Sequence, residues 1–184
     1  ENQTLKPLTQ VLKEELAVPD NQIVVLSGPN HSEEVSRKVP SATVVAAPEL
    51  KIAKTIQEAF ISPYFRVYTN LDRLGVEMGG ALKNVFAMAA GVSDGLNYGD
   101  NTKAALVTRA LAEMRRLGEI MGAQPLTFSG LSGLGDLYVT TASKHSRNAW
   151  AGRQIGKGRS LEEILNSTPM VIEGVPTTKA AYFL

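Results

Sequence analysis

The first seventy residues alternate between a helical and an extended hydrophobic pattern. Apolar residues recur at helical spacing between positions 5 and 16, and again between 49 and 60. A further helix start is expected at Ser32, before two glutamates. Short apolar runs typical of buried strands lie at 22–26, 43–47 and 65–69. Strands that alternate with helices predict a parallel sheet in an α/β domain.

After residue 70 the pattern becomes almost entirely helical. Glycine-rich breaks are expected at 91–99, 130–135 and 156–158. The clearest helix is predicted over 101–122, where an apolar stripe ends at Gly122, a residue suited to the position after a helix. We therefore predict an α/β part followed by an all-α part, with a boundary near residues 71–75.

Composition excludes several classes of function. The 19 Lys and Arg balance 18 Asp and Glu, and aromatic residues are 6% of the chain, so nucleic acid is not an expected partner. The absence of cysteine and the presence of only two histidines argue against a Cys- or His-based metal centre. The most apolar window, 78–92, contains Lys83, so no membrane span is predicted. We expect a cytoplasmic protein.

Lys83 is the least expected residue of the helix predicted over 76–91. That segment is apolar nearly all round, which indicates a helix buried on most sides. Small residues, among them Gly79, Gly80 and Ala87, lie beside Lys83 on the helix and would leave room for a ligand. A desolvated lysine gives up its proton more readily, which suits proton transfer. The alternative is a lysine that reaches solvent between two helices.

Two later segments bring polar groups to a glycine loop and a helix start. The loop 130–135 holds three glycines and leads to Asp136; it either brings backbone close to a ligand or is a connection with Asp136 as its N-cap. Ser146, Arg147 and Asn148 offer hydroxyl, guanidinium and amide donors at a helix start, which suits a phosphate group. A solvated basic helix is the alternative for this cluster.

A turn also follows directly on the strand predicted at 22–26. It reads Ser-Gly-Pro-Asn at 27–30. In a doubly wound sheet the carboxyl ends of the strands face the ligand crevice, so this turn is a candidate for contact with substrate or cofactor. An ordinary connecting turn explains the same residues.

The motifs at 27–30 and around Lys83 and Asp136 belong to a longer series. In order, the series is Ser-Gly-Pro-Asn at 27–30, Gly-Gly-Ala-Leu-Lys-Asn-Val-Phe-Ala at 79–87, Gly-Leu-Asn-Tyr-Gly-Asp-Asn-Thr-Lys at 95–103, Leu-Ser-Gly-Leu-Gly-Asp at 131–136 and His-Ser-Arg-Asn at 145–148. With this order and spacing, the chain resembles the bacterial type of NAD(P)-dependent glycerol-3-phosphate dehydrogenase. The resemblance implies a 6-phosphogluconate-dehydrogenase-like fold. Residues 1–72 would be part of a Rossmann-type NAD(P)-binding domain with a parallel sheet, and residues 73–184 an all-α substrate-binding and catalytic domain.

The resemblance also implies a reaction and the residues that carry it. Dihydroxyacetone phosphate and NAD(P)H would give sn-glycerol 3-phosphate for phospholipid synthesis, with NAD or NADP as cosubstrate and no metal. Lys83 would be the general acid and base, with Asp136 as its charge partner. Substrate contacts are implied for Gly28, Asn30, Lys83, Asp136, Ser146, Arg147 and Asn148, and cofactor contacts for Ser32, Arg147, Val171 and Glu173.

The chain also departs from the family pattern. No strand with a G-x-G-x-x-G loop for the pyrophosphate is found, and neither is the Lys-Gly element that precedes the first helix, while residues 177–184 read as the opening of a helix that the family continues. Asn30 and Ser32 stand where the family often has Ser or Thr and Ala. We therefore expect a fragment that is inactive alone, from a protein for which a homodimer is allowed. The alternatives are another dehydrogenase of the same wider group and a non-catalytic binding module.

Overall fold

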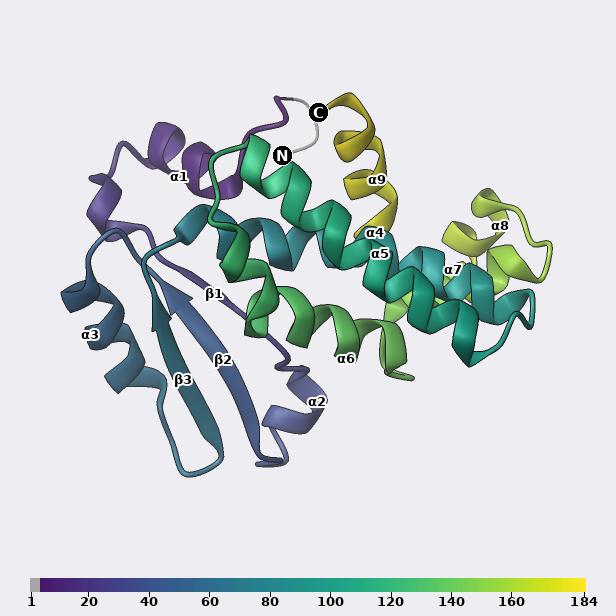
Figure 1. The fold of residues 1–184 in the computed structure, drawn as a ribbon, viewed down its shortest axis with the longest axis horizontal. Coiled ribbons are helices and arrows are strands. Elements are labelled where there is room, and N and C mark those ends of the chain that lie inside the picture. The colour runs from purple at the N-terminus through teal and green to yellow at the C-terminus, as the bar shows by residue number, and fades with distance from the viewer. Residues whose placement is uncertain (1–3) are drawn as a thin grey trace.

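A small sheet and a larger set of helices meet at one long helix, α4 (Figure 1). The computed structural model describes residues 4–184; residues 1–3, which the predicted first domain includes, lie outside the described residues. The elements in chain order are α1 (Leu8–Leu16), the 3₁₀ turn η1 (Asp20–Gln22), β1 (Val25–Ser27), α2 (Ser32–Val35), β2 (Ser41–Ala46), α3 (Leu50–Phe60), β3 (Phe65–Asn70), α4 (Arg73–Gly95), α5 (Asp100–Ile120), the 3₁₀ segment η2 (Pro125–Ser129), the π-helical turn η3 (Leu131–Gly135), α6 (Asp136–Ala142), α7 (Arg147–Gly156), α8 (Leu161–Asn166) and α9 (Gly174–Phe183).

The sheet has the order β1-β2-β3 and is mixed. Strands β2 and β3 are parallel as predicted, with Val44 opposite Tyr68. The prediction of a wholly parallel sheet is wrong for β1, which runs antiparallel to β2. The only helix between β1 and β2 is α2, whose four residues are too few to lie along the sheet as a crossover helix. The chain therefore turns back beside the strand that it has just left.

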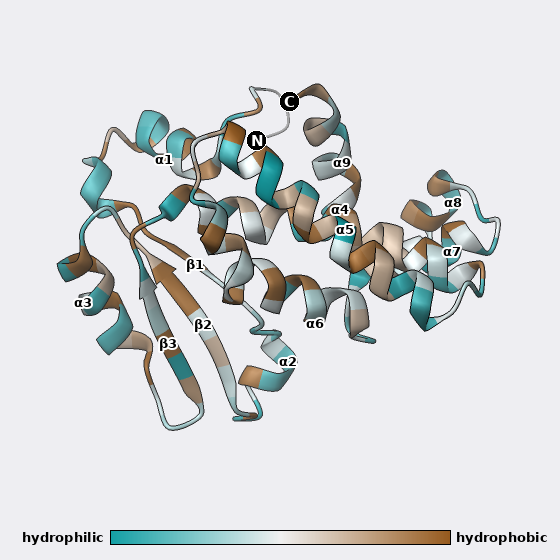
Figure 2. Cartoon of the chain, in the orientation of Figure 1, coloured by the Kyte–Doolittle hydropathy of each residue, from teal (hydrophilic) through white to brown (hydrophobic). Residues whose placement is uncertain are grey.

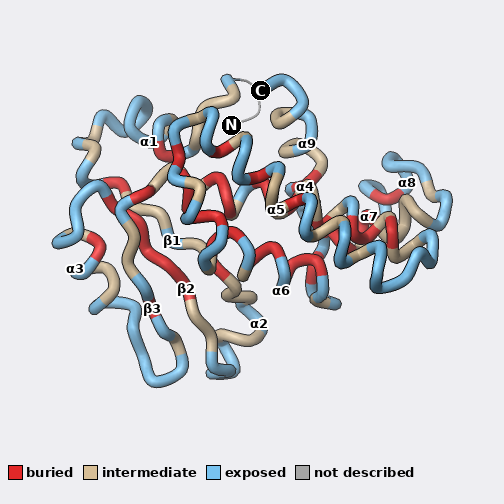
Figure 3. The backbone as a smooth tube through the Cα atoms, viewed as in Figure 1, coloured by how far each residue is buried: buried red, intermediate tan, exposed pale blue. Residues whose placement is uncertain are grey.

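The two faces of the sheet are covered by different helices. Side chains alternate across a strand, so Val45 packs toward α3, where it contacts Ala53. Its neighbours Val44 and Ala46 pack on the opposite face against Val76 of α4. The apolar residues of β2 are brown in Figure 2, and β2 and α4 carry much of the buried chain that is red in Figure 3. Helix α4 therefore packs against the sheet on one side and contributes to the core of the helical part on another.

Helix α4 is longer than the predicted 76–91 and passes through a glycine that was expected to break it. It continues to Gly95 because Gly91 and Gly95, the glycines of its last turns, face α7. A Cβ on Gly91 would collide with the main-chain carbonyl of Ala149, and a Cβ on Gly152 of α7 would collide with that of Met88. The two helices therefore touch backbone to backbone. This contact fixes the position of α7, whose first residue is Arg147, against α4.

The junction between the sheet and α4 is closed by Asp72. Its side chain is buried and caps α4 by accepting a hydrogen bond from Gly75 N at 2.9 Å. The other carboxylate oxygen accepts bonds from Gln124 N at 2.8 Å and Thr127 Oγ1 at 2.6 Å, in the segment that follows α5. One carboxylate thus ties the end of β3, the start of α4 and the segment around η2 together.

The helical part has its own core, in which Met78 and Leu82 of α4 pack with Met114, Phe128 and Leu137. The helix predicted over 101–122 is confirmed as α5, and Gly122 adopts a φ of 96° just beyond it. The segment 130–135 is a π-helical turn that continues into α6. Within residues 4–184, no helix has the length and apolar content that crossing a bilayer requires. The domain boundary after residue 72 stays a prediction.

Candidate active site

Lys83 and Asp136 form the centre of the site. Lys83 lies near the middle of α4, and its Nζ is 2.6 Å from Oδ2 of Asp136, the first residue of α6. The side chain of Lys83 is 20% exposed and that of Asp136 is 4% exposed. The lysine therefore does not simply reach solvent between two helices, and Asp136 is not an N-cap, since Gly135 holds that position. Its carboxylate instead accepts from Lys83 and from Thr140 Oγ1.

Burial sets the acidity of Asp136. Loss of water around the carboxylate raises the pKa of Asp136 above its ordinary value, and the nearby Lys83 ammonium offsets part of this rise. The charged pair is thus held in a poorly hydrated place, where each charge depends on the other. Such a pair keeps the ammonium group fixed beside an open cavity.

Removing Lys83 is expected to make stability more sensitive to pH. An acid whose pKa is higher in the folded than in the unfolded chain loses stability as pH rises between the two values. Without the ammonium group, the pKa of Asp136 should rise further, so the free energy of unfolding of Lys83→Met should fall more steeply with pH than that of wild type. Urea unfolding at a series of pH values measures this slope. Adding Asp136→Asn should flatten it, and equal slopes in wild type and Lys83→Met would contradict the prediction.

The turn after β1 lies close to this pair. Gly28 has a φ of 145°, and a Cβ there would be 3.1 Å from Thr43 Cα, so only glycine fits without strain. Asn30 Nδ2 donates to Thr43 Oγ1 at 3.0 Å, which anchors the turn to β2. On the other side, Gly80 of α4 leaves room for Ser27. The two glycines bring the turn to the cavity beside Lys83.

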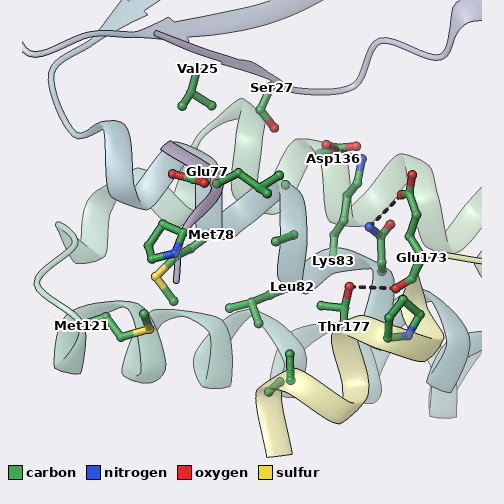
Figure 4. A pocket seen from close by; sticks show the side chains of 18 of the residues that line it. Val25, Ser27, Glu77, Met78, Leu82, Lys83, Met121, Asp136, Glu173 and Thr177 are labelled. Atoms are coloured by element: carbon green, nitrogen blue, oxygen red, sulfur yellow. Dashed lines mark hydrogen bonds and ion pairs between the residues drawn. The ribbon is translucent and has the colours of Figure 1, made fainter. Parts of the chain in front are cut away.

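A cavity of about 710 Å³ opens beside Lys83 and is lined by residues of β1, α4 and α9. Figure 4 shows Lys83 pointing toward Asp136, with Glu173 close by and apolar Val25 and Met78 farther along the wall. Gly28 and Asn30 also line this cavity. The volume lies in the range of small-ligand sites.

A second cavity, of about 190 Å³, shares Lys83 with the first. Its wall contains the predicted residues Ser32, Ser146, Arg147, Asn148, Val171 and Glu173. Ser146 is buried and accepts a hydrogen bond from Ala149 N, so it caps α7, while Arg147 is exposed. Hydroxyl, guanidinium and amide groups thus converge near Lys83 at a helix start. Ser146 and Asn148 are buried, so a solvated helix face does not describe these two residues, whereas Arg147 is solvated.

Asn84 is a site residue that the sequence reasoning did not single out. Its Oδ1 accepts from Asn148 Nδ2 at 2.9 Å, and its Nδ2 donates to Glu173 Oε2 at 3.3 Å. Asn148 Oδ1 in turn accepts from Gly174 N at 2.8 Å. This chain of bonds joins α4, α7 and α9 beside Lys83. The sequence indication for Asn84 was that it follows Lys83 in the 79–87 motif. That position alone does not distinguish a site residue from a core residue.

The structure brings every predicted site residue to one of the two cavities that meet at Lys83. Their roles as catalytic, substrate-binding or cofactor-binding residues stay predictions. Residues 4–184 hold no group of three or more His, Asp or Glu side chains arranged to bind a metal ion.

Comparison with known proteins gives a consistent set of similarities. A family model described as "NAD-dependent glycerol-3-phosphate dehydrogenase C-terminus" matches residues 72–184, and the corresponding N-terminus model matches residues 1–53. The chain is 57% identical over 182 residues to a glycerol-3-phosphate dehydrogenase [NAD(P)+] of Pelotomaculum thermopropionicum, covering 98% of this chain and 52% of that protein. It is 56% identical over 184 residues to that of a Thermoanaerobacter species, covering 100% and 55%.

Solved structures extend the similarity to the fold. A crystal structure of glycerol-3-phosphate dehydrogenase from Coxiella burnetii superposes with a TM-score of 0.93 at 37% identity, over 98% of this chain and 55% of that one. A structure of the Saccharomyces cerevisiae enzyme gives a TM-score of 0.84 at 29% identity, over 95% and 52%. The chain spans about half the length of the curated relatives that it matches.

Proposed function

Because this chain belongs to the NAD-dependent glycerol-3-phosphate dehydrogenase family, we propose that the protein carrying it reduces dihydroxyacetone phosphate to sn-glycerol 3-phosphate. The observation that carries the proposal is the Lys83–Asp136 ion pair, because Lys83 borders both cavities. One cavity offers donors for a phosphate group, and the other has room for a larger partner. The proposal takes the cytoplasm as the compartment and a homodimer as an allowed assembly.

Lys83 acts as the general acid in this proposal. As the carbonyl carbon of dihydroxyacetone phosphate is reduced, negative charge develops on its oxygen. The Lys83 ammonium donates a proton to that oxygen, which gives the hydroxyl of the product and leaves a neutral amine. In the reverse direction the amine accepts the hydroxyl proton. Asp136 holds the Nζ atom in place through the ion pair at 2.6 Å.

The groups at the start of α7 bind the substrate phosphate in this proposal. Arg147 can meet two phosphate oxygens at once, and the free main-chain N–H groups of the helix start add a favourable dipole. Asn148 is held by Asn84, so it reaches the cavity in one orientation. Gly28 and Asn30 close the other side of the substrate, next to Lys83. Binding of the phosphate thereby places the carbonyl near the lysine.

The residues of this chain suit one end of a nicotinamide cofactor. The cavity wall beside Lys83 combines the main chain of Gly28, the apolar Val25 and the polar Asn30 and Glu173, which suits a flat ring with an amide group. Ser32, Val171 and Glu173 are the further proposed cofactor contacts, together with Arg147. The hydride needed for the reduction is supplied by NAD(P)H when it is bound. The sequence has no G-x-G-x-x-G loop for the pyrophosphate.

The test is an assay of the full-length protein that contains this sequence. Loss of reduced nicotinamide absorbance should be far faster with dihydroxyacetone phosphate than with dihydroxyacetone or with unphosphorylated keto acids of similar size. The reverse reaction should consume sn-glycerol 3-phosphate. Oxidation of a hydroxy acid in preference to glycerol 3-phosphate would refute the proposed substrate, and an absence of turnover with every substrate would refute the proposed enzyme.

A further inference from the structure

We propose that His31 and His145 complete the substrate phosphate site. This inference rests on the proposed function, in which the smaller cavity receives the phosphate. The chain has only two histidines, one in each part of the predicted fold, separated by 114 positions. The structure places their rings 6.5 Å apart between centroids, and both line that cavity.

The two rings belong to different parts of the fold. His31 precedes α2, on the sheet side, and His145 precedes Ser146 and the start of α7. Their planes are inclined at 59°, so they do not stack on each other. Both histidines line the same cavity as Lys83 and Arg147. Such a convergence of nitrogen donors suits a small anion with oxygens on all sides.

His31 has an unused hydrogen-bonding atom. Among residues 4–184, two buried side-chain polar atoms lack a hydrogen-bond partner, and they are His31 Nε2 and Ser93 Oγ. Leaving such an atom unpaired is unfavourable, so native proteins supply a partner for most of them. The Nε2 atom is covered by protein atoms, so a ligand can reach it only after the ring turns about its side-chain bonds. Changes of this kind are common when a site is filled.

The neighbouring charges agree with an anion as the occupant. Lys83 from α4 and Arg147 from α7 bring positive charge to the cavity. The carboxylate of Asp136 on α6 is paired with Lys83. The acidic side chains of the lining are Glu173, which accepts a bond from Asn84, and Glu33 at the start of α2. Glu33 is exposed; hydrogen bonds from its own main-chain N–H and from Ser32, and to a smaller extent the two histidines, lower the pKa of its carboxyl group. An imidazole N–H donates to a phosphate oxygen in either protonation state, so the proposal needs no particular charge on the rings.

The test compares phosphorylated and unphosphorylated substrates in the full-length protein. His31→Phe keeps a planar ring and removes both nitrogens. It should raise KM for dihydroxyacetone phosphate by about tenfold or more, the factor that corresponds to one hydrogen bond to a charged group. The kcat/KM for dihydroxyacetone, which lacks the phosphate, should stay within about twofold of wild type, because the lost bond is made to the phosphate alone.

Two further variants sharpen the result. His31→Gln retains a side-chain N–H donor and should restore most of the lost affinity. Glu33→Gln removes a negative charge at the rim and should lower KM for dihydroxyacetone phosphate by about twofold, a change of the opposite sign. Ser93→Ala is the matched control, since it removes the other unpartnered buried atom, at a residue outside both cavity linings, and should leave KM unchanged.

Calorimetric titration with inorganic phosphate separates this proposal from the proposed function. Wild type should bind phosphate, and His31→Phe and His145→Ala should each bind it more weakly, even if dihydroxyacetone phosphate is not the substrate. Equal effects of His31→Phe on both substrates would assign the histidine to the fold or to the Lys83–Asp136 pair and would overturn the proposal. Unchanged phosphate affinity in both variants would overturn it as well. If wild type binds phosphate but does not turn over dihydroxyacetone phosphate, the proposed function is refuted and the histidine phosphate site is not.

Discussion

Lys83→Met in the full-length protein is expected to lower kcat for reduction of dihydroxyacetone phosphate by about a thousandfold, while the protein stays folded. Methionine keeps the length and apolar stem of lysine but has no proton to give to the carbonyl oxygen. Losing a well-placed general acid costs roughly 10²–10⁴-fold in rate. The loss of charge beside the substrate adds to this effect. Steady-state kinetics and circular dichroism on the same preparation measure the two quantities.

The matched control for this variant is Lys103→Met. Lys103 also lies on a helix and forms an ion pair, with Asp94 at 2.7 Å, but it is outside both cavity linings. Its kcat should remain within about twofold of wild type. If Lys83→Met fails to fold because Asp136 is left unpaired, Lys83→Met with Asp136→Asn removes the buried charge and can be assayed in its place. A kcat near the wild-type value in either folded variant would refute the acid role of Lys83.

Gly91→Ala is expected to lower the free energy of unfolding by about 3 kcal/mol, at the upper end of the cost of overfilling a packed core. The new methyl group has no space, because it would meet the carbonyl of Ala149 on α7. Alanine favours a helix over glycine by about 1 kcal/mol, so helix propensity alone would make Gly91→Ala more stable. A net loss of unfolding free energy therefore reports the collision with α7. Pushing α7 away from α4 should also raise KM for dihydroxyacetone phosphate, since Ser146 and Asn148 move with α7. Urea unfolding and steady-state kinetics measure the two effects.

Gly135→Ala is the control for the glycine substitution. A Cβ on Gly135 would lie 3.6 Å from the Pro29 ring, which is an ordinary contact. Its unfolding free energy should therefore differ from wild type by less than about 1 kcal/mol. If Gly91→Ala proves as stable as Gly135→Ala, the close backbone contact between α4 and α7 does not constrain the fold in the way that the structure indicates.

The hydrophobic pattern predicted most helices and strands, because their buried residues recur with the period of the element along the chain. The parallel pairing of β2 with β3 and the end of α5 just before Gly122 followed from short-range rules on strand runs and on glycine after helices. The direction of β1 could not be predicted, because hydrophobic periodicity is the same for parallel and antiparallel strands. Gly91 and Gly95 of α4 were misread as part of a break, since their role depends on α7, which follows much later in the sequence.

The candidate site was predicted unevenly for a similar reason. Lys83 was conspicuous because a charged residue in an apolar helix is costly, and Asp136 because it ends a glycine-rich segment. Asn84 gave no such signal, although it holds Asn148 and Glu173. The meeting of His31 with His145 is also a property of the folded chain, because no local pattern connects residues so far apart in sequence.

By fixing the first turn of α4, Asp72 also fixes the position of Lys83 farther along the same helix. Lys83 lies about ten residues beyond the start of α4, and at a rise of about 1.5 Å per residue this is roughly 15 Å from the fixed end. A tilt of about 4° at that end would displace the lysine by about 1 Å, and an error of that size can reduce a rate by about a hundredfold. The Asp72 carboxylate bonds this end to Gln124 and Thr127. It therefore controls how accurately the Lys83 ammonium group is placed beside the substrate carbonyl oxygen.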